Sequence, residues 1–164
     1  ERDVAILGVY ESTNTAYAGQ IIDFEVIVEN EGPVAETFNV TLQNNVTVIE
    51  KRTVTSLAPN TNTSLIFNWN TSTVPPGYYL ISATAEPVPG ETDLTDNSKT
   101  DGTVRIKIPG DIDGDGDVVA NDFYIFSGAY GTSPPSDPRA DLDGDGDVDA
   151  NDFYIFSGNY GKTI

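Results

Sequence analysis

Residues 21–30, IIDFEVIVEN, alternate apolar and polar side chains along their length. Ile22, Phe24, Val26 and Val28 therefore fall on one face of an extended chain, and acidic side chains occupy most of the other face. A period of two residues is typical of a β-strand that has one face in a core and the other in water. The stretch predicts one strand of a half-buried sheet.

Outward from this stretch, the same period recurs as far as residue 108, and no helical period competes with it. Clusters of turn-forming residues at 30–33, 44–45, 59–60, 75–77 and 87–90 separate the segments. About seven strands in about 105 residues indicate an all-β sandwich of the immunoglobulin type. The expected strands are Val4–Tyr10, 21–30, 38–42, Val46–Leu57, 65–69, 79–85 and 104–108.

The segments carry further motifs in a fixed order: an Asp-Val start, AGQIIDFEVIVENEGPVAETFNVTL (18–42), SLAPNTNTSLIFNWN (56–70), PPGYYLISATAEP (75–87) and Asp96-Asn97 before the last strand. The order of these features resembles the CARDB family over most of residues 3–108. CARDB domains are immunoglobulin-like modules of secreted and cell-surface proteins of bacteria and archaea. The resemblance implies a non-catalytic spacer or adhesion module without a defined ligand.

A second pattern follows Pro109-Gly110, where the sequence repeats itself at an offset of thirty residues. DIDGDGDVVANDFYIFSGAYG (111–131) and DLDGDGDVDANDFYIFSGNYG (141–161) match at 18 of 21 positions. The predicted division is an immunoglobulin-like sandwich over 1–108 and a small α module of two EF-hand-like loop–helix repeats over 109–164. Because the linker has only two residues, we expect the two domains to pack on each other.

Each repeat opens with a twelve-residue loop in the register of an EF-hand, which takes oxygen ligands at positions 1, 3, 5, 7 and 12 and a glycine at position 6. Calcium suits such a loop because it accepts many oxygen ligands in a flexible geometry, so two Ca²⁺ ions are expected. Position 8 is Val118 in one loop and Val148 in the other, which predicts that the loops pair with each other as a short β-bridge. The expected ligands are Asp111, Asp113, Asp115, the carbonyl of Asp117 and Asp122 in the first loop, and Asp141, Asp143, Asp145, the carbonyl of Asp147 and Asp152 in the second.

The two loops differ at position 9, which is Val119 in the first and Asp149 in the second. Asp149 offers an additional oxygen ligand that Val119 lacks. We therefore expect two different calcium affinities, with the stronger site at residues 141–152.

A short helix follows each loop directly. In the first repeat an apolar stripe of Phe123, Ile125, Phe126 and Tyr130 is expected in the core, and Gly131 is placed to end the helix. Two short helices exclude water only by packing on each other. No helix is expected before either loop, so the pattern is not that of a complete EF-hand. The second repeat carries the same stripe at Phe153, Ile155, Phe156 and Tyr160, with Gly161 after it.

A duplicated loop with an exiting helix resembles the dockerin type I family, over residues 109–164. The resemblance implies docking onto a cohesin-like domain, which attaches a larger protein to a surface scaffold. The near-identity of the halves indicates either a pseudo-twofold surface that docks in two orientations or only a symmetric core. Dockerins contact their partner through loop positions 10 and 11 and helix positions 17 and 18, which are here Ala120, Asn121, Ser127, Gly128, Ala150, Asn151, Ser157 and Gly158.

Composition excludes several function classes. The chain has 26 acidic and 8 basic residues, a net charge of −18, which disfavours nucleic acid and anionic membranes as partners. It contains no Cys and no His, so zinc clusters, disulfides, thiol nucleophiles and imidazole bases are absent. No apolar run is long enough to span a membrane. The chain starts Glu-Arg-Asp and has no Met, so we expect a piece of a longer protein.

These features predict a non-catalytic, extracellular pair of modules, either secreted or on the cell surface, whose calcium-loaded tail docks onto a cohesin-type partner. The alternatives are a calcium-stiffened tail without a partner, a carbohydrate-binding sandwich and a calcium sensor. Trp69 is in phase with core residues, although a sugar platform is the alternative for its ring. Two further features stay open: a third cation in the acidic loop of residues 86–97, and glycosylation at the sequons of Asn39, Asn45, Asn62 and Asn70.

Overall fold

The computed structural model describes all 164 residues, Glu1–Ile164. The chain divides into two compact units. The first comprises Glu1–Thr73 and Tyr78–Arg105, and the second comprises Ile106–Ile164 together with Val74–Gly77. The boundary after residue 108 and the packing of the two domains on each other stay predictions.

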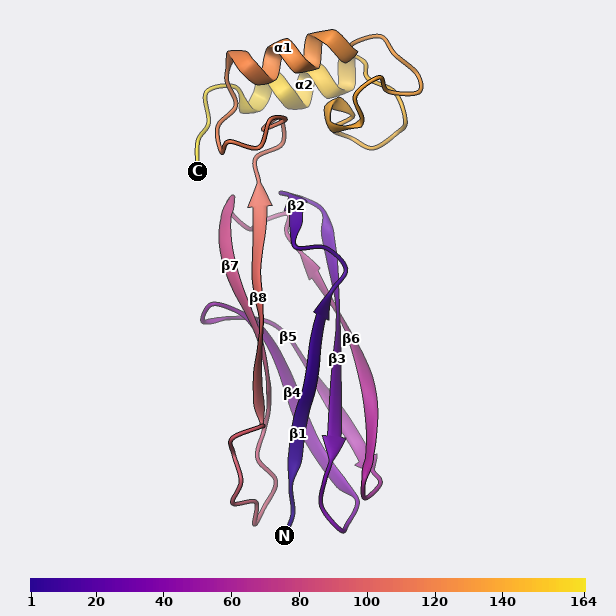
Figure 1. Ribbon diagram of the computed structural model, residues 1–164, viewed down its shortest axis with the longest axis vertical. Coiled ribbons are helices and arrows are strands. Elements are labelled where there is room, and N and C mark those ends of the chain that lie inside the picture. Colours follow the sequence, from indigo (N-terminus) through magenta and orange to yellow (C-terminus); the bar gives the residue numbers. More distant parts are fainter. The chain divides into compact units, whose positions relative to one another are not determined.

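The first unit is a β-sandwich of two sheets (Figure 1). One sheet has three strands in the order β1-β3-β6, and the other has five in the order β2-β8-β7-β4-β5. The sandwich therefore contains eight strands, one more than the sequence predicts. Their bounds are β1 Val4–Glu11, β2 Thr15–Tyr17, β3 Ile21–Asn30, β4 Glu36–Asn44, β5 Thr47–Leu57, β6 Thr61–Asn70, β7 Gly77–Ala85 and β8 Ser98–Lys107.

Strand β3 lies in the middle of the smaller sheet and pairs with β6 along its whole length, from Ile21 opposite Asn70 to Asn30 opposite Thr61. Its apolar face is fully buried, and its acidic face is exposed or half-buried. The alternation in residues 21–30 is thereby confirmed as the pattern of a strand packed on one side.

Trp69 belongs to this core. Its ring is buried, with its centroid 6.4 Å from that of Phe24 and 5.5 Å from that of Tyr79. The indole face is covered by these neighbours and is not offered to a ligand. The core interpretation of Trp69 is confirmed.

The additional strand, β2, has only three residues, too few to show a two-residue period. Its middle residue, Ala16, is buried. The hydroxyl of the buried Thr71 donates to the carbonyl of Gln20 at 2.6 Å and accepts the N–H of Gly19 at 3.0 Å. The place of β2 thus depends on a residue about fifty positions away, which local sequence does not indicate.

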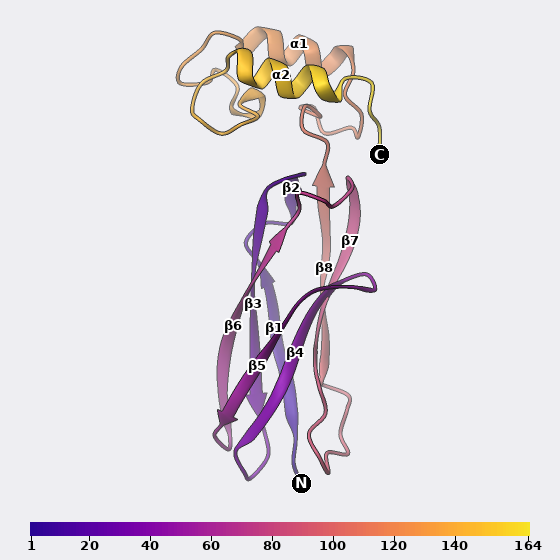
Figure 2. The same ribbon diagram turned by 180° about the vertical axis from the view of Figure 1, so that it is seen from behind.

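The second unit contains helix α1 (Ala120–Ala129), the 3-10 turn η1 (Pro138–Ala140) and helix α2 (Ala150–Asn159). The two α-helices lie side by side in both views (Figures 1 and 2). The rings of Phe126 and Phe156 stack between them, with centroids 5.3 Å apart. Neither ten-residue helix is long and apolar enough to cross a bilayer. The rest of this core consists of Ile108, Ile112, Val118, Ala129, Ala140 and Val148.

The expectation that the whole aromatic stripe is core is wrong. Phe126 and Phe156 are buried, but Phe123 and Phe153 remain 46% and 45% exposed. Tyr130 and Tyr160 follow the last helical residue and are about half exposed. The two short helices and a few residues outside them share one small core, which covers only a narrow stripe of each helix, so the flanking rings stay in contact with water.

Candidate functional site

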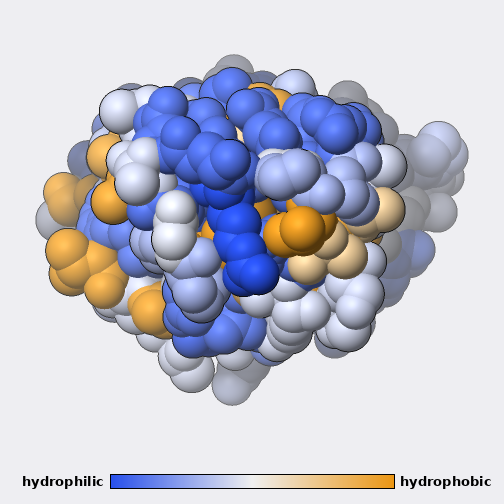
Figure 3. Space-filling view, turned by 90° about the horizontal axis from the view of Figure 1, so that it is seen from below, coloured by the Kyte–Doolittle hydropathy of each residue, from blue (hydrophilic) through white to orange (hydrophobic).

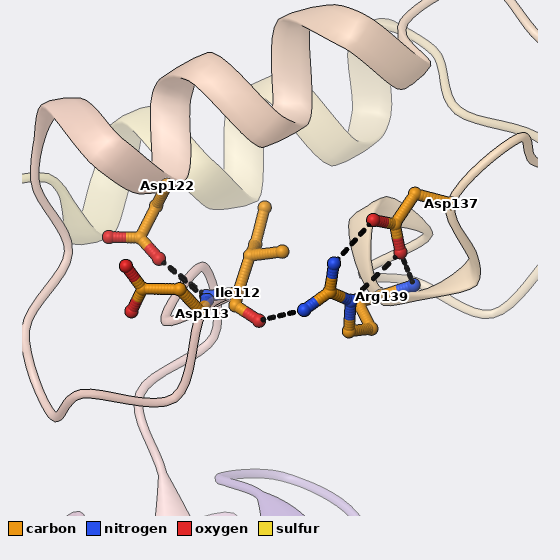
Figure 4. A network of polar contacts seen from close by, with 5 residues as sticks. All are labelled: Ile112, Asp113, Asp122, Asp137 and Arg139. Atoms are coloured by element: carbon orange, nitrogen blue, oxygen red, sulfur yellow. Dashed lines mark hydrogen bonds and ion pairs between the residues drawn. The ribbon is translucent and has the colours of Figure 1, made fainter.

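The first acidic loop is closed by the carboxylate of Asp122, at loop position 12. Its Oδ1 accepts the N–H groups of Ile112 at 2.7 Å and Asp113 at 3.0 Å (Figure 4). Its Oδ2 accepts the N–H of Val119 at 2.9 Å. Because these donors lie at both ends of the loop, one buried side chain ties the start of the loop to the start of helix α1.

The second loop repeats this closure at Asp152. Its Oδ1 accepts from Leu142 at 2.7 Å and Asp143 at 3.2 Å, and its Oδ2 accepts from Asp149 at 2.8 Å. The matching distances differ by no more than 0.2 Å from those around Asp122. The sequence repeat is therefore a repeat of structure.

Between its ends, each loop curls through short side-chain-to-backbone bonds. In the first loop, Asp113 Oδ1 accepts the N–H of Asp115 at 3.1 Å, and Asp115 Oδ1 accepts the N–H of Asp117 at 3.1 Å. The turn requires a left-handed residue at position 6, where Gly116 has φ +107° and Gly146 has φ +97°. The curl turns several carboxylates toward one point.

The structure brings together most, but not all, of the expected ligands. Carboxylate oxygens lie within 4.8 Å of one another in three groups: Asp111, Asp113 and Asp122; Asp141, Asp143 and Asp152; and Asp147, Asp149 and Asp152. Asp115 and Asp145 belong to none of these groups, and each accepts the N–H two residues further on. Asp117 was expected to contribute only its carbonyl.

Like charges crowd these groups. Desolvation raises the pKa of Asp147, and the charges of Asp145 and Asp149 raise it further. In the first loop, the N–H of Asp115 lowers the pKa of Asp113, but burial and the neighbouring charges outweigh it, so the pKa is raised. A carboxyl whose pKa is raised by other carboxylates gains from a nearby cation.

The residues fit a hard divalent cation. Every donor atom in the groups is a carboxylate oxygen, with no nitrogen or sulfur that would favour zinc. In the second loop, Asp147 Oδ1 is shielded from solvent without a hydrogen-bond partner. A buried carboxylate oxygen left in this way is typical of a position that a cation satisfies.

Position 9 has a role that spacing alone does not indicate. Asp149 Oδ1 accepts the N–H of Asn151 at 2.7 Å, so Asp149 caps helix α2 as well as joining an acidic group. Val119 makes no side-chain bond at the start of α1. The two repeats are thus unequal in both charge and helix capping.

The expected pairing of Val118 with Val148 is wrong. Val118 pairs with residues that follow α2, and Val148 pairs with residues that follow α1. Because α1 and α2 pack side by side, the chain leaving each helix runs past the loop of the other repeat.

The connection between the repeats is held by Arg139, in η1. Its guanidinium forms two bonds with the carboxylate of Asp137, at 3.0 and 2.7 Å, and donates to the carbonyl of Ile112 at 3.3 Å (Figure 4). Arg139 therefore links the approach to the second loop with the start of the first.

The eight candidate partner-contact residues, at loop positions 10 and 11 and helix positions 17 and 18 of both repeats, are all exposed. The sequence did not indicate two further exposed residues, Tyr124 and Tyr154, which stand 80% exposed on the two helices. Shallow grooves of about 330 and 450 Å³ flank the helix pair. They share Phe123 and Phe153 in their walls.

A separate acidic cluster lies at the end of the sandwich where the N terminus is, a face whose middle is strongly hydrophilic (Figure 3). Asp3, Glu31 and Asp96 have carboxylate oxygens within 4.8 Å of one another. The sequence placed this cluster wholly within residues 86–97, but only Asp96 of that loop joins it. The reason is the fold, which brings the N-terminal residues and the β3–β4 turn beside the loop.

Neighbouring polar groups hold this end in place. The buried Asn30 donates to the carbonyls of Val34 at 2.7 Å and Leu57 at 2.8 Å, and so fixes the turn that carries Glu31. Glu91 accepts the N–H of Val4 at 2.9 Å, and so anchors the loop to the chain beside Asp3.

The model of the CARDB family matches residues 2–101. The chain belongs to the CARDB family. Among solved structures, a Pyrococcus furiosus CARDB domain in complex with di-metal ions is 24% identical, with a TM-score of 0.55, over 64% of this chain and 93% of that chain. A Methanosarcina acetivorans domain, whose parent protein is assigned to the cell surface, is 22% identical, with a TM-score of 0.51, over 64% and 91% of the two chains. At these identities the likeness shows the fold alone. No curated protein matches the sequence.

The acidic cluster gives the CARDB domain a pH dependence. Burial raises the pKa of Asp3 to about 6, and the charges of Asp96, Glu31, Glu91 and Asp93 add to the shift. Because the pKa of this carboxyl is higher in the folded state than its ordinary value, the stability that it contributes is complete at low pH. That contribution is lost as the pH rises through about 6.

We therefore expect the CARDB domain to lose stability mainly between about pH 4 and about pH 6, and Asp3→Asn to reduce this dependence and to stabilise the domain at pH 7.5. Trp69 is the one tryptophan, so its fluorescence in urea titrations reports on this domain. Glu25→Gln, which removes an exposed charge on β3, is the control and should leave the slope unchanged. An unaltered slope in Asp3→Asn would show that other groups cause it.

Proposed function

We propose that the chain is a non-catalytic, extracellular pair of modules, in which a CARDB domain carries a dockerin-like tail of two calcium sites. The tail docks onto a cohesin-like partner and so attaches a larger secreted or surface protein. The cell-surface assignment of the Methanosarcina acetivorans relative supports the location.

The observation that carries this proposal is the duplicated closed loop. In each repeat a buried aspartate at position 12 holds three backbone N–H groups, and two further carboxylates of the same loop lie within 4.8 Å of it. Such crowding of like charge is unfavourable without a counter-ion. Asp111, Asp113 and Asp122 would hold one ion, and Asp141, Asp143 and Asp152 the other, with Asp147 and Asp149 beside it.

A bound calcium ion supplies two positive charges to each group. The chain does the rest: Asp122 and Asp152 keep each loop closed, and each closed loop fixes the first turn of the helix after it. Isolated ten-residue helices are marginal in water, so the loops decide whether the helix surface exists.

The exposed helix surface supports a docking role. The eight positions that dockerins use for contact are exposed and uncharged, and they occur in two equivalent sets. Rings of Phe123, Phe153, Tyr124 and Tyr154 add exposed apolar area beside them. Aromatic side chains of this kind often serve as anchors in protein interfaces.

The alternatives have less support. A sugar platform at Trp69 lacks an exposed ring. A calcium sensor needs an α-helix before each loop, whereas Pro109-Gly110 precedes the first and the 3-10 turn η1 precedes the second. A calcium-stiffened tail without a partner uses the same loops, so binding experiments separate it from docking.

Calcium should raise the melting temperature of the tail. At free calcium of about 1,000 times the dissociation constant, each site should add ~4 kcal/mol to the free energy of unfolding. In EDTA, the helical circular-dichroism signal should be lost at a lower temperature than in calcium. The melting temperature of the CARDB domain, followed by Trp69 fluorescence, should shift much less. A tail that melts identically with and without EDTA would refute the metal assignment.

The two sites should bind calcium with different affinities, the stronger at residues 141–152, because Asp149 adds a carboxylate and caps α2. Isothermal titration calorimetry should resolve the two. Asp149→Val should weaken the second site toward the first, and Val119→Asp should strengthen the first toward the second. Sites that stay indistinguishable in all three proteins would contradict the expected inequality.

Docking should require calcium and one intact half. Binding to cohesin domains encoded in the same genome, measured by biolayer interferometry, should disappear in EDTA. If the pseudo-twofold surface docks in two orientations, Ser127→Glu and Ser157→Glu should each be tolerated, and the double variant should lose binding. Ser64→Glu, an exposed position on the sandwich, is the charge control. Calcium-dependent melting without any cohesin binding would favour the stiffened tail.

A further inference from the structure

In the tail, the first loop pairs with the chain that leaves the second helix. Val118 donates its N–H to the carbonyl of Lys162 at 2.9 Å, and its own carbonyl accepts the N–H of Gly161 at 2.7 Å. The N–H of Ile164 bonds to the carbonyl of Gly116 at 2.9 Å. Three backbone hydrogen bonds therefore join loop one to residues 161–164.

The second loop pairs in the same way with the chain that leaves the first helix. Val148 donates to the carbonyl of Thr132 at 3.1 Å and accepts from the N–H of Gly131 at 2.7 Å. Each loop is thus bonded to the end of the other repeat and not to the end of its own.

The bonding pattern bears on the ligand at position 7. Asp117 lies opposite Thr163 in an antiparallel bridge, and the bonds on either side of this pair come from the neighbouring residues. In such a pair, the N–H and C=O groups of both residues point away from the partner strand. The N–H of Asp117 reaches Asp115 Oδ1 inside the loop, and its C=O lies on the same edge of the extended chain.

We propose that each calcium site is completed by the other repeat: residues 161–164 position the carbonyl of Asp117 for site one, and residues 131–132 support the corresponding turn of site two. Loading loop one therefore orders residues 161–164, which follow the second helix, and loading loop two orders residues 131–132, which follow the first helix. This inference rests on the proposed calcium binding.

The crossed arrangement compensates the weaker loop. Loop one lacks a carboxylate at position 9, where it has Val119. Three backbone hydrogen bonds join loop one to the segment after α2, whereas two join loop two to the segment after α1. The additional bond comes from Ile164. A single backbone hydrogen bond of about 1 kcal/mol corresponds to an approximately fivefold change in affinity.

Amide hydrogen exchange on the whole chain tests the crossing directly, with calcium chloride as the ligand. Asp113→Ala and Asp143→Ala are matched variants at position 3 of the two loops. In saturating calcium, Asp113→Ala should speed the amide exchange of Gly161 and Ile164, which follow loop two, and leave the amide of Gly131 protected. Asp143→Ala should expose Gly131, which follows loop one, and leave Gly161 protected.

The outcomes separate this inference from the proposed function. Each variant could speed amide exchange only in the segment of its own repeat, or both could speed it equally at all three amides. Either result would show that the loops are not supported by the other repeat, although calcium binding stands. If the unsubstituted chain binds no calcium, the proposed function itself fails and the inference fails with it.

A second test compares a variant that removes one backbone donor with a variant that keeps it, and neither changes a carboxylate. Ile164→Pro deletes the N–H that bonds to Gly116, and Ile164→Ala keeps it. Calcium titration followed by the amide signals of Gly116 and Gly146 should show about fivefold weaker binding at loop one in Ile164→Pro, and none of this change at loop two. Equal affinities in the proline and alanine variants would overturn the role assigned to residues 161–164.

Discussion

The tail depends on one arrangement, in which a buried carboxylate at loop position 12 accepts hydrogen bonds from three backbone N–H groups. Asp122 joins the first residues of its loop to the residue before α1, and Asp152 does the same before α2. This closure keeps the carboxylates of each loop in a space where they repel one another. Closure and repulsion oppose each other, so a cation that removed the repulsion would favour the closed loop.

The sandwich is held instead by burial of apolar side chains, and its fold could be predicted closely from local sequence. Alternation places Phe24, Phe67 and Trp69 inside, and the register of β3 with β6 keeps them there. Of the eight strands, only β2 was not predicted. Its three residues have no period, and its position is fixed by Thr71, far along the chain.

The curl of the acidic loops could also be predicted, because their aspartates are local in sequence and the spacing of Asp and Gly determines the turn. What spacing does not show are contacts between distant segments. The partner of Val118 depends on where the end of α2 runs, and the exposure of Phe123 depends on how two helices share one narrow core. The grouping of Asp3 with Glu31 and Asp96 likewise requires the folded sandwich.

The same distinction applies to the order of the short tail. Its two helices are too short to persist alone, and their shared core rests on Phe126 and Phe156. The remaining order comes from the loops and from the backbone bonds that cross between repeats. Because each loop is bonded to the segment that follows the helix of the other repeat, a change in one loop bears on both repeats. Under the proposed function, calcium therefore acts through the fold of the surface and not as a bridge to the partner.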